Sequence, residues 1–106
     1  MINKIIEAIN LVQTDWRERG FAFNNEKTTD IILGDCNEVT IPPIENKIGT
    51  FHIHTIDYSK PSEEDFKVFL NSSDRLLCYA TPIEDLWRYR CYDRETSVVL
   101  EEELKL

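Results

Sequence analysis

Residues Gly49–Phe66 read GTFHIHTIDYSKPSEEDF, a strand-like alternation that runs into a helix start. We expect residues 50–56 to form a strand, in which side chains two residues apart point to the same face. His52 and His54 are the two histidines of the chain, and they would stand side by side on that face. The apolar residues between and before them would face the opposite layer. Two neighbouring imidazoles on a strand suit the binding of one metal ion.

A helix is expected to begin within the PSEEDF stretch, residues 61–66. Ser62 and Asp65 fit a capping box, in which the serine accepts from a backbone N–H and the acid reaches back to the helix start. From this place Asp65 can supply a third metal ligand. Capping alone would explain both residues, and a lone His-x-His pair is commonly a chance surface pair. Neither explanation accounts for the seven residues between His54 and Ser62.

The whole spacing, His-x-His, seven residues, Ser, two residues, Asp, resembles the zinc motif of the JAMM (MPN-plus) metallopeptidases. Roughly the last 60 residues look like the small stand-alone prokaryotic members of that family. The resemblance implies an α/β sandwich similar to cytidine deaminases, with a mixed β-sheet flanked by helices. It also implies a Zn²⁺ ion held by His52, His54 and Asp65, and a Ser62 hydroxyl that helps stabilise the oxyanion, a contribution on the order of 3 kcal/mol.

Members of that family use a glutamate outside the zinc motif as general base and then as acid toward the leaving amine. Glu18, within ERGFAF, stands where the first helix is expected to pass into the first strand, which is similar to the place of that glutamate. Glu18 is therefore the preferred catalytic residue beside Ser62. Glu26 in an expected hairpin turn, Glu38 at a strand start and Glu45 in a proline-rich loop stay open as alternatives.

Hydrophobic periodicity predicts the remaining elements. The first half should form a helix over 2–19 that Gly20 ends, strands near 21–23, 29–33 and 38–41, and a loop over 42–47 that leads to the histidine strand. A second helix should follow, with Phe66, Phe69 and Leu70 on its apolar side, and end at residues 71–74. Three strands separated by turns at Thr81–Pro82 and 93–96 should complete the chain. This order indicates a single α/β domain over residues 1–106 with a mixed sheet.

Composition and charge limit the expected binding partners of the chain and its expected cellular compartment. The chain has 106 residues and a formal net charge of −8, and its lysines are scattered, which argues against nucleic acid as a ligand. Without an apolar segment that would suit a signal peptide or membrane span, we expect a cytoplasmic protein with reduced cysteines. Cys78 and Cys91 fall in neighbouring strands; we expect them to be small apolar thiols, with a disulfide as the less favoured alternative. The oligomeric state stays open.

Taken with the resemblance, these residues predict a zinc-dependent isopeptidase or peptidase. It would use a metal-activated water to hydrolyse the bond after the C-terminal tail of a ubiquitin-like or sulfur-carrier protein. The alternative is a non-catalytic, zinc-stabilised interaction module, since JAMM folds also serve as scaffolds. A deaminase is excluded because the chain lacks His-x-Glu and Pro-Cys-x-x-Cys.

Overall fold

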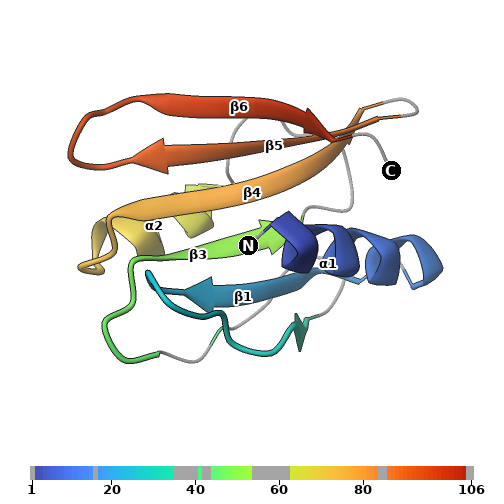
Figure 1. Cartoon of the computed structure of the whole chain (residues 1–106). Coiled ribbons are helices and arrows are strands. Elements are labelled where there is room, and N and C mark those ends of the chain that lie inside the picture. Colours follow the sequence, from blue (N-terminus) through green and yellow to red (C-terminus); the bar gives the residue numbers. More distant parts are fainter. Residues whose placement is uncertain are drawn as a thin grey trace.

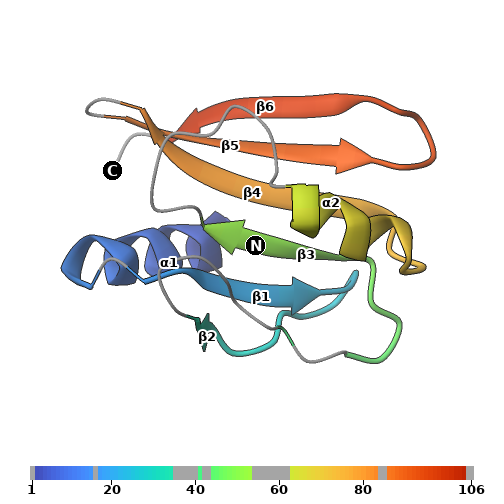
Figure 2. The same ribbon diagram turned by 180° about the vertical axis from the view of Figure 1, so that it is seen from behind.

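A six-stranded mixed sheet carries one helix on each face (Figures 1 and 2). The computed structural model describes residues 2–15, 17–34, 41, 44–53, 63–83 and 86–104, without the side chains of 63–65 and 83. In chain order the elements are α1 (Ile2–Thr14), β1 (Arg19–Phe23), β2 (Ile32–Leu33), β3 (Gly49–Ile53), α2 (Glu63–Leu70), β4 (Leu76–Ile83), β5 (Leu86–Asp93) and β6 (Val99–Leu104). The expected mixed α/β architecture is thus confirmed.

The strands lie in the order β2-β1-β3-β4-β5-β6. Only β3 and β4 run parallel, while the other neighbouring pairs are antiparallel. Parallel neighbours need a crossover connection, and here that crossover contains α2. As a result the strand that carries His52 lies inside the sheet, bonded on both sides.

The hydrophobic core lies between α1 and one face of the sheet. Ile5, Ile9 and Val12 form the buried stripe of the helix, at the intervals that the sequence predicts. They belong to one cluster with Phe21 of β1 and Phe51 of β3, whose rings stack with centroids 5.1 Å apart. This packing fixes β1 against β3 and thereby sets the register of the opposite face as well.

The first helix is shorter than its periodicity predicts, because it ends at Thr14 and not near residue 19. The Thr14 hydroxyl donates to the Leu11 carbonyl at 2.8 Å at this end. Gly20 does not end the helix; it lies inside β1. A Cβ at Gly20 would come within 2.7 Å of the Ile41 Cδ1 and 2.9 Å of the Phe51 carbonyl oxygen, so close packing explains the glycine.

The turn expected at Thr81–Pro82 is wrong, because β4 continues through both residues to Ile83. Thr81 is fully buried, and Pro82 lies opposite Trp87 of β5. On the other side of β4, pairing with β3 stops at Ala80. Among the described residues Pro82 therefore has a strand neighbour on one side only, which is where a sheet tolerates a residue without an N–H.

Cys78 and Cys91 are joined by a disulfide, so the expectation of separate thiols is wrong. They lie directly opposite each other in the β4–β5 pair, with Cα atoms 4.1 Å apart. Their expected place in the apolar core is confirmed. The sequence separation of 13 residues makes this a bridge across one hairpin.

Several smaller predictions have mixed outcomes. The strand expected over 29–33 is reduced to Ile32–Leu33, and residues 35–40 lie outside the described part of the chain. Phe69 is buried on the inner side of α2, but Leu70 is exposed and does not belong to that apolar stripe. The turn after Asp93 is confirmed, with the Ser97 N–H donating to the Asp93 carbonyl at 2.8 Å. Where the structure describes the chain, its helices are too short or too polar for a membrane span.

Candidate metal centre

His52 occupies the fourth position of β3 and points away from the core. Burial alternates along this strand, with Phe51 and Ile53 fully buried against α1 and His52 half-buried on the other face. This alternation is the one predicted from the sequence. His52 lies directly opposite Gly20 of β1 on one side and Tyr79 of β4 on the other. The imidazole is thus held by a strand that has neighbours on both edges.

Glu18 reaches the same face from the residue before β1. Its carbonyl accepts the Gly34 N–H at 2.8 Å, which continues the β1–β2 pairing by one residue. Residues two apart on an extended chain share a face, so Glu18 and Gly20 point to the same side. Gly20 is opposite His52. Glu18 and His52 are therefore diagonal neighbours, a relation with Cα atoms roughly 7–8 Å apart.

Glu18 is also a buried acid, with 8% of its surface exposed. Most glutamates lie on the surface, and a buried one is held by specific interactions. Glu18 has such contacts within the chain. Glu18 lies between α1 and β1, and its assignment as the general base stays a prediction. Glu26, the alternative in the hairpin turn, is exposed and its backbone N–H donates to the Asn24 side chain.

The second helix packs on the face to which His52 points. Phe66 and Phe69 of α2 each contact Tyr92 edge-on, with ring centroids 5.8 Å apart. Through β4, Tyr92 stands in the same cross-strand row as Thr50, which shares a face with His52. Figure 2 shows α2 in front of the sheet and α1 behind it. The helix of the crossover therefore lies on the histidine face of the sheet.

Asp65 is the third residue of α2, so its backbone lies in the first turn of that helix, as predicted. Its side chain lies outside the described part of the structure, as do His54 and Ser62. Among the residues that the structure does describe, no group of three or more metal-ligating side chains is assembled. The structure thus places Glu18 and His52 on one face of the sheet, and α2, which carries Asp65, packs on that same face against Tyr92 of β5.

A polar row that sequence reasoning missed continues from His52 across the sheet. Tyr79 lies opposite His52, Arg90 opposite Tyr79, and Glu101 opposite Arg90. Arg90 is 7% exposed, and its Nε donates to the Glu101 Oε2 at 2.7 Å. Burial raises the pKa of the Tyr79 phenol, and the Arg90 guanidinium opposes part of that rise. The signal in the sequence was the alternation of arginine with aromatic residues along β5.

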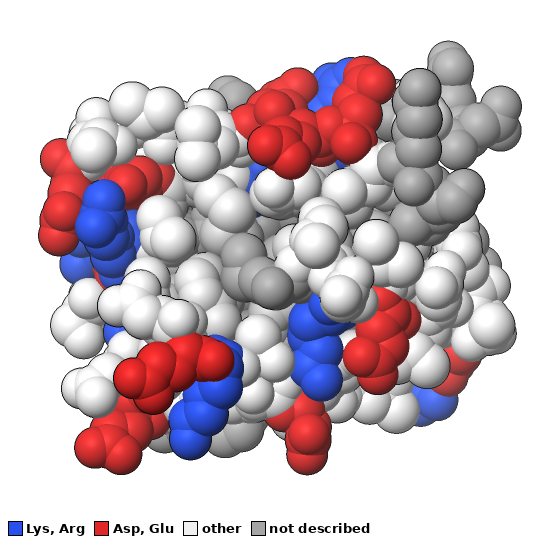
Figure 3. All heavy atoms as spheres, in the orientation of Figure 1, with Lys and Arg blue, Asp and Glu red and all other residues white. Residues whose placement is uncertain are grey.

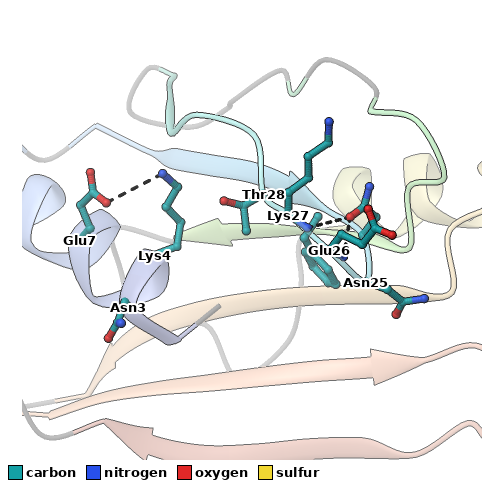
Figure 4. A pocket seen from close by; sticks show the side chains of 9 residues that line it. Asn3, Lys4, Glu7, Asn25, Glu26, Lys27 and Thr28 are labelled. Atoms are coloured by element: carbon teal, nitrogen blue, oxygen red, sulfur yellow. Dashed lines mark hydrogen bonds and ion pairs between the residues drawn. The ribbon is translucent and has the colours of Figure 1, made fainter.

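A separate hollow of about 500 Å³ lies between the start of α1 and the turn after β1 (Figure 4). Its lining is mainly polar and includes Lys4, Glu7, Asn24 and Lys27. Lys4 and Glu7 are paired at 3.9 Å on its helical side. Neither Glu18 nor His52 lines this hollow, so it does not belong to the candidate metal centre.

The described part of the candidate centre therefore consists of a buried acid just before β1 and a half-buried imidazole on β3, with α2 packed on the same face of the sheet. Comparison of the chain with models of known protein families, with curated proteins and with solved structures found no match.

Proposed function

We propose that the chain is a zinc-dependent isopeptidase or peptidase that cleaves after the C-terminal tail of a ubiquitin-like or sulfur-carrier protein. The observation that carries the proposal is the placement of Glu18 beside His52 on one face of the sheet. The substrate class rests on the resemblance of the motif to JAMM metallopeptidases. The packing of α2 on the histidine face adds support, since this helix contains Asp65.

The residues fit a zinc ion by their chemistry. Two imidazoles and one carboxylate are a common ligand set for a catalytic zinc that keeps one position open. His52 and His54 are two residues apart in the sequence, and His52 belongs to a strand that is paired on both sides. His52, His54 and Asp65 would hold the ion.

When bound, zinc would supply a Lewis acid that makes water acidic enough to attack near neutral pH. Glu18 would accept the proton of the attacking water and then pass it to the leaving amine. The low exposure of Glu18 limits competition from bulk water at this step. Ser62 would donate a hydrogen bond to the carbonyl oxygen as negative charge develops there.

The experiment compares purified wild type, His52→Ala and Glu18→Gln for zinc content and for cleavage of a ubiquitin-like fusion. We expect wild type to bind zinc and cleave, and His52→Ala to lose both properties. Glu18→Gln should retain zinc but lose cleavage about 10²- to 10⁴-fold, because it keeps the shape of the side chain and removes the base. Glu26→Gln, at an exposed turn residue, is the matched control and should behave as wild type.

Two outcomes would contradict the proposal. Undiminished cleavage by Glu18→Gln or His52→Ala would remove the assigned roles. If wild type binds zinc but does not cleave, and if Glu18→Gln binds the same partner proteins as wild type, the non-catalytic interaction module would be favoured.

A further inference from the structure

The outer edge of β6 is open in the described part of the chain. β6 is the last strand in the sheet order, and among the described residues no strand pairs with its far side. The other edge strand, β2, has two residues, whereas β6 has six. A strand with an open edge presents a row of backbone donors and acceptors that can pair with a further extended segment.

The side chains of β6 leave this edge accessible. Proteins commonly protect an edge strand with charged side chains. Here Glu101 and Glu103 are bonded inward to β5: Arg90 contacts Glu101 at 2.7 Å, and Arg88 contacts Glu103 at 3.0 Å. Their carboxylates therefore lie against the neighbouring strand and do not cover the outer backbone. Glu102 accepts a hydrogen bond at 3.0 Å from the Tyr89 hydroxyl, an uncharged group.

Apolar side chains stand beside these acids. Val99 is 52% exposed and Leu100 is 64% exposed, and both belong to β6. Leu100 and Glu102 are two residues apart, so they point to the same face of the sheet. Leu100 lies opposite Cys91 of the core, so this is the face on which α1 packs further along the sheet. The open edge thus offers an exposed leucine and a carboxylate without a basic partner among the described residues, side by side on one face.

Charge determines which segment fits. An antiparallel pairing of two copies of β6 would bring Glu102 of each chain close to the acids of the other, and like charges opposite each other destabilise a sheet. The net charge of −8 adds to this repulsion. Figure 3 shows acidic side chains gathered along the upper side of the molecule, where β6 lies in Figure 1. A basic segment meets attraction at the same place.

We propose that β6 binds an extended peptide segment by strand addition, with an apolar and a basic residue two positions apart that face Leu100 and Glu102. Backbone hydrogen bonds would supply most of the affinity, and this pair of side chains would supply the selectivity. β6 is three strands from β3, or about 14 Å at the usual strand spacing. The surface is therefore separate from the candidate metal centre.

The test uses the full chain and a labelled, capped eight-residue peptide with leucine and lysine two positions apart and threonine elsewhere. Fluorescence anisotropy gives the Kd for wild type, for Glu102→Lys and for Glu26→Lys, which changes the net charge equally at a distant turn. We expect Glu102→Lys to weaken binding about fivefold or more, since one attraction becomes a repulsion. A peptide with glutamate in place of lysine should recover the affinity toward Glu102→Lys. Glu26→Lys should leave the Kd unchanged.

N-methylated peptides test strand addition directly in wild type, even if the β6 variant fails to fold. Methyl groups on the amides of one peptide edge should abolish binding, while the same number on the other edge should leave it intact. Equal effects of the two methylated peptides would overturn the proposal. The proposal would also be overturned if Glu102→Lys and Glu26→Lys weakened peptide binding equally. A further contrary result would be a wild-type dimer, detected by sedimentation, whose stability Glu102→Lys changes in either direction. His52→Ala should retain peptide affinity whether or not the chain is a zinc enzyme.

Discussion

Asp93 ends β5 and accepts hydrogen bonds from an arginine side chain and from a turn amide. Arg75 donates to the two carboxylate oxygens at 3.3 and 3.0 Å, and the Glu95 backbone N–H donates to Oδ1 at 2.9 Å. The hydrogen bond from Arg75, together with the backbone amides of Glu95 and Thr96, lowers the pKa of Asp93 below its ordinary value near 3.8. Charge-assisted hydrogen bonds of this kind favour the ionised form.

A pH dependence follows from that shift. A carboxyl whose pKa is lower in the folded than in the unfolded protein contributes stability above about pH 4, and this stability is lost as the pH falls through the folded value. We expect wild type to lose more stability between pH 5 and about pH 2 than Asp93→Asn does. Thermal unfolding across this range measures the difference, and Arg75→Met should shift the Asp93 carboxyl titration upward in NMR. Parallel pH profiles for wild type and Asp93→Asn would contradict the assignment.

Single residues also show which parts of the site the sequence could predict. The opposite orientation of His52 and Phe51 follows from strand alternation alone and is confirmed. The role of Gly20 was misread, because its cause is the approach of Ile41 and of the β3 backbone, which are distant in sequence. Arg90 was passed over because burial of its guanidinium depends on Glu101 from another strand.

At the scale of elements, the disulfide joins β4 to β5 across their hairpin. Cross-linking residues 13 apart removes chain entropy from the unfolded state, a stabilisation of about 3 kcal/mol for loops of this size. We expect reducing agent to lower the urea midpoint of wild type accordingly. The double variant Cys78→Ala, Cys91→Ala should unfold at equal midpoints with and without reductant.

Cys36→Ser is the control for this prediction, since it removes a thiol and leaves the bridge. Its urea midpoint should still respond to reductant as wild type does. A wild-type midpoint that reductant does not change would show that the bridge contributes nothing to stability.

The end of α2 is attached to the sheet by one arginine. Arg94 donates to the Ser72 carbonyl at 2.8 Å and to the Phe69 carbonyl, and its guanidinium lies 4.5 Å from the centre of the Phe69 ring. Cations near a helix C-terminus satisfy its last carbonyls and interact well with its dipole. This contact positions the helix that contains Asp65.

We expect Arg94→Ala to lower the free energy of unfolding by about 1–2 kcal/mol, because two helix-end carbonyls lose a charged donor. Urea unfolding gives the stability, and a competition assay should show weaker zinc binding if α2 carries a ligand. Arg17→Ala is the matched control, because Arg17 pairs with exposed Asp15 and such pairs contribute little. Equal stability of the Arg94→Ala and Arg17→Ala variants would refute the role of Arg94.

For the whole molecule, the order of elements was more predictable than their ends. Amphipathic periodicity identified both helices, and the strands of the second half follow from apolar alternation. The continuation of β4 through Pro82 could not be predicted, because it depends on β3 being shorter than β4. Pairing between strands distant in the chain is information that local patterns do not contain. The placement of Glu18 beside His52 depends on that same pairing.

The interior position of β3 should make the backbone around His52 resistant to local unfolding. Backbone amides bonded on both edges of a strand in the core exchange their hydrogens with solvent only in rare, large openings. The main chain at His52 should thus belong to the slowest-exchanging part of the protein. If the chain binds zinc as proposed, loss of the ion would leave the backbone at His52 in place, and rebinding would require no refolding of β3.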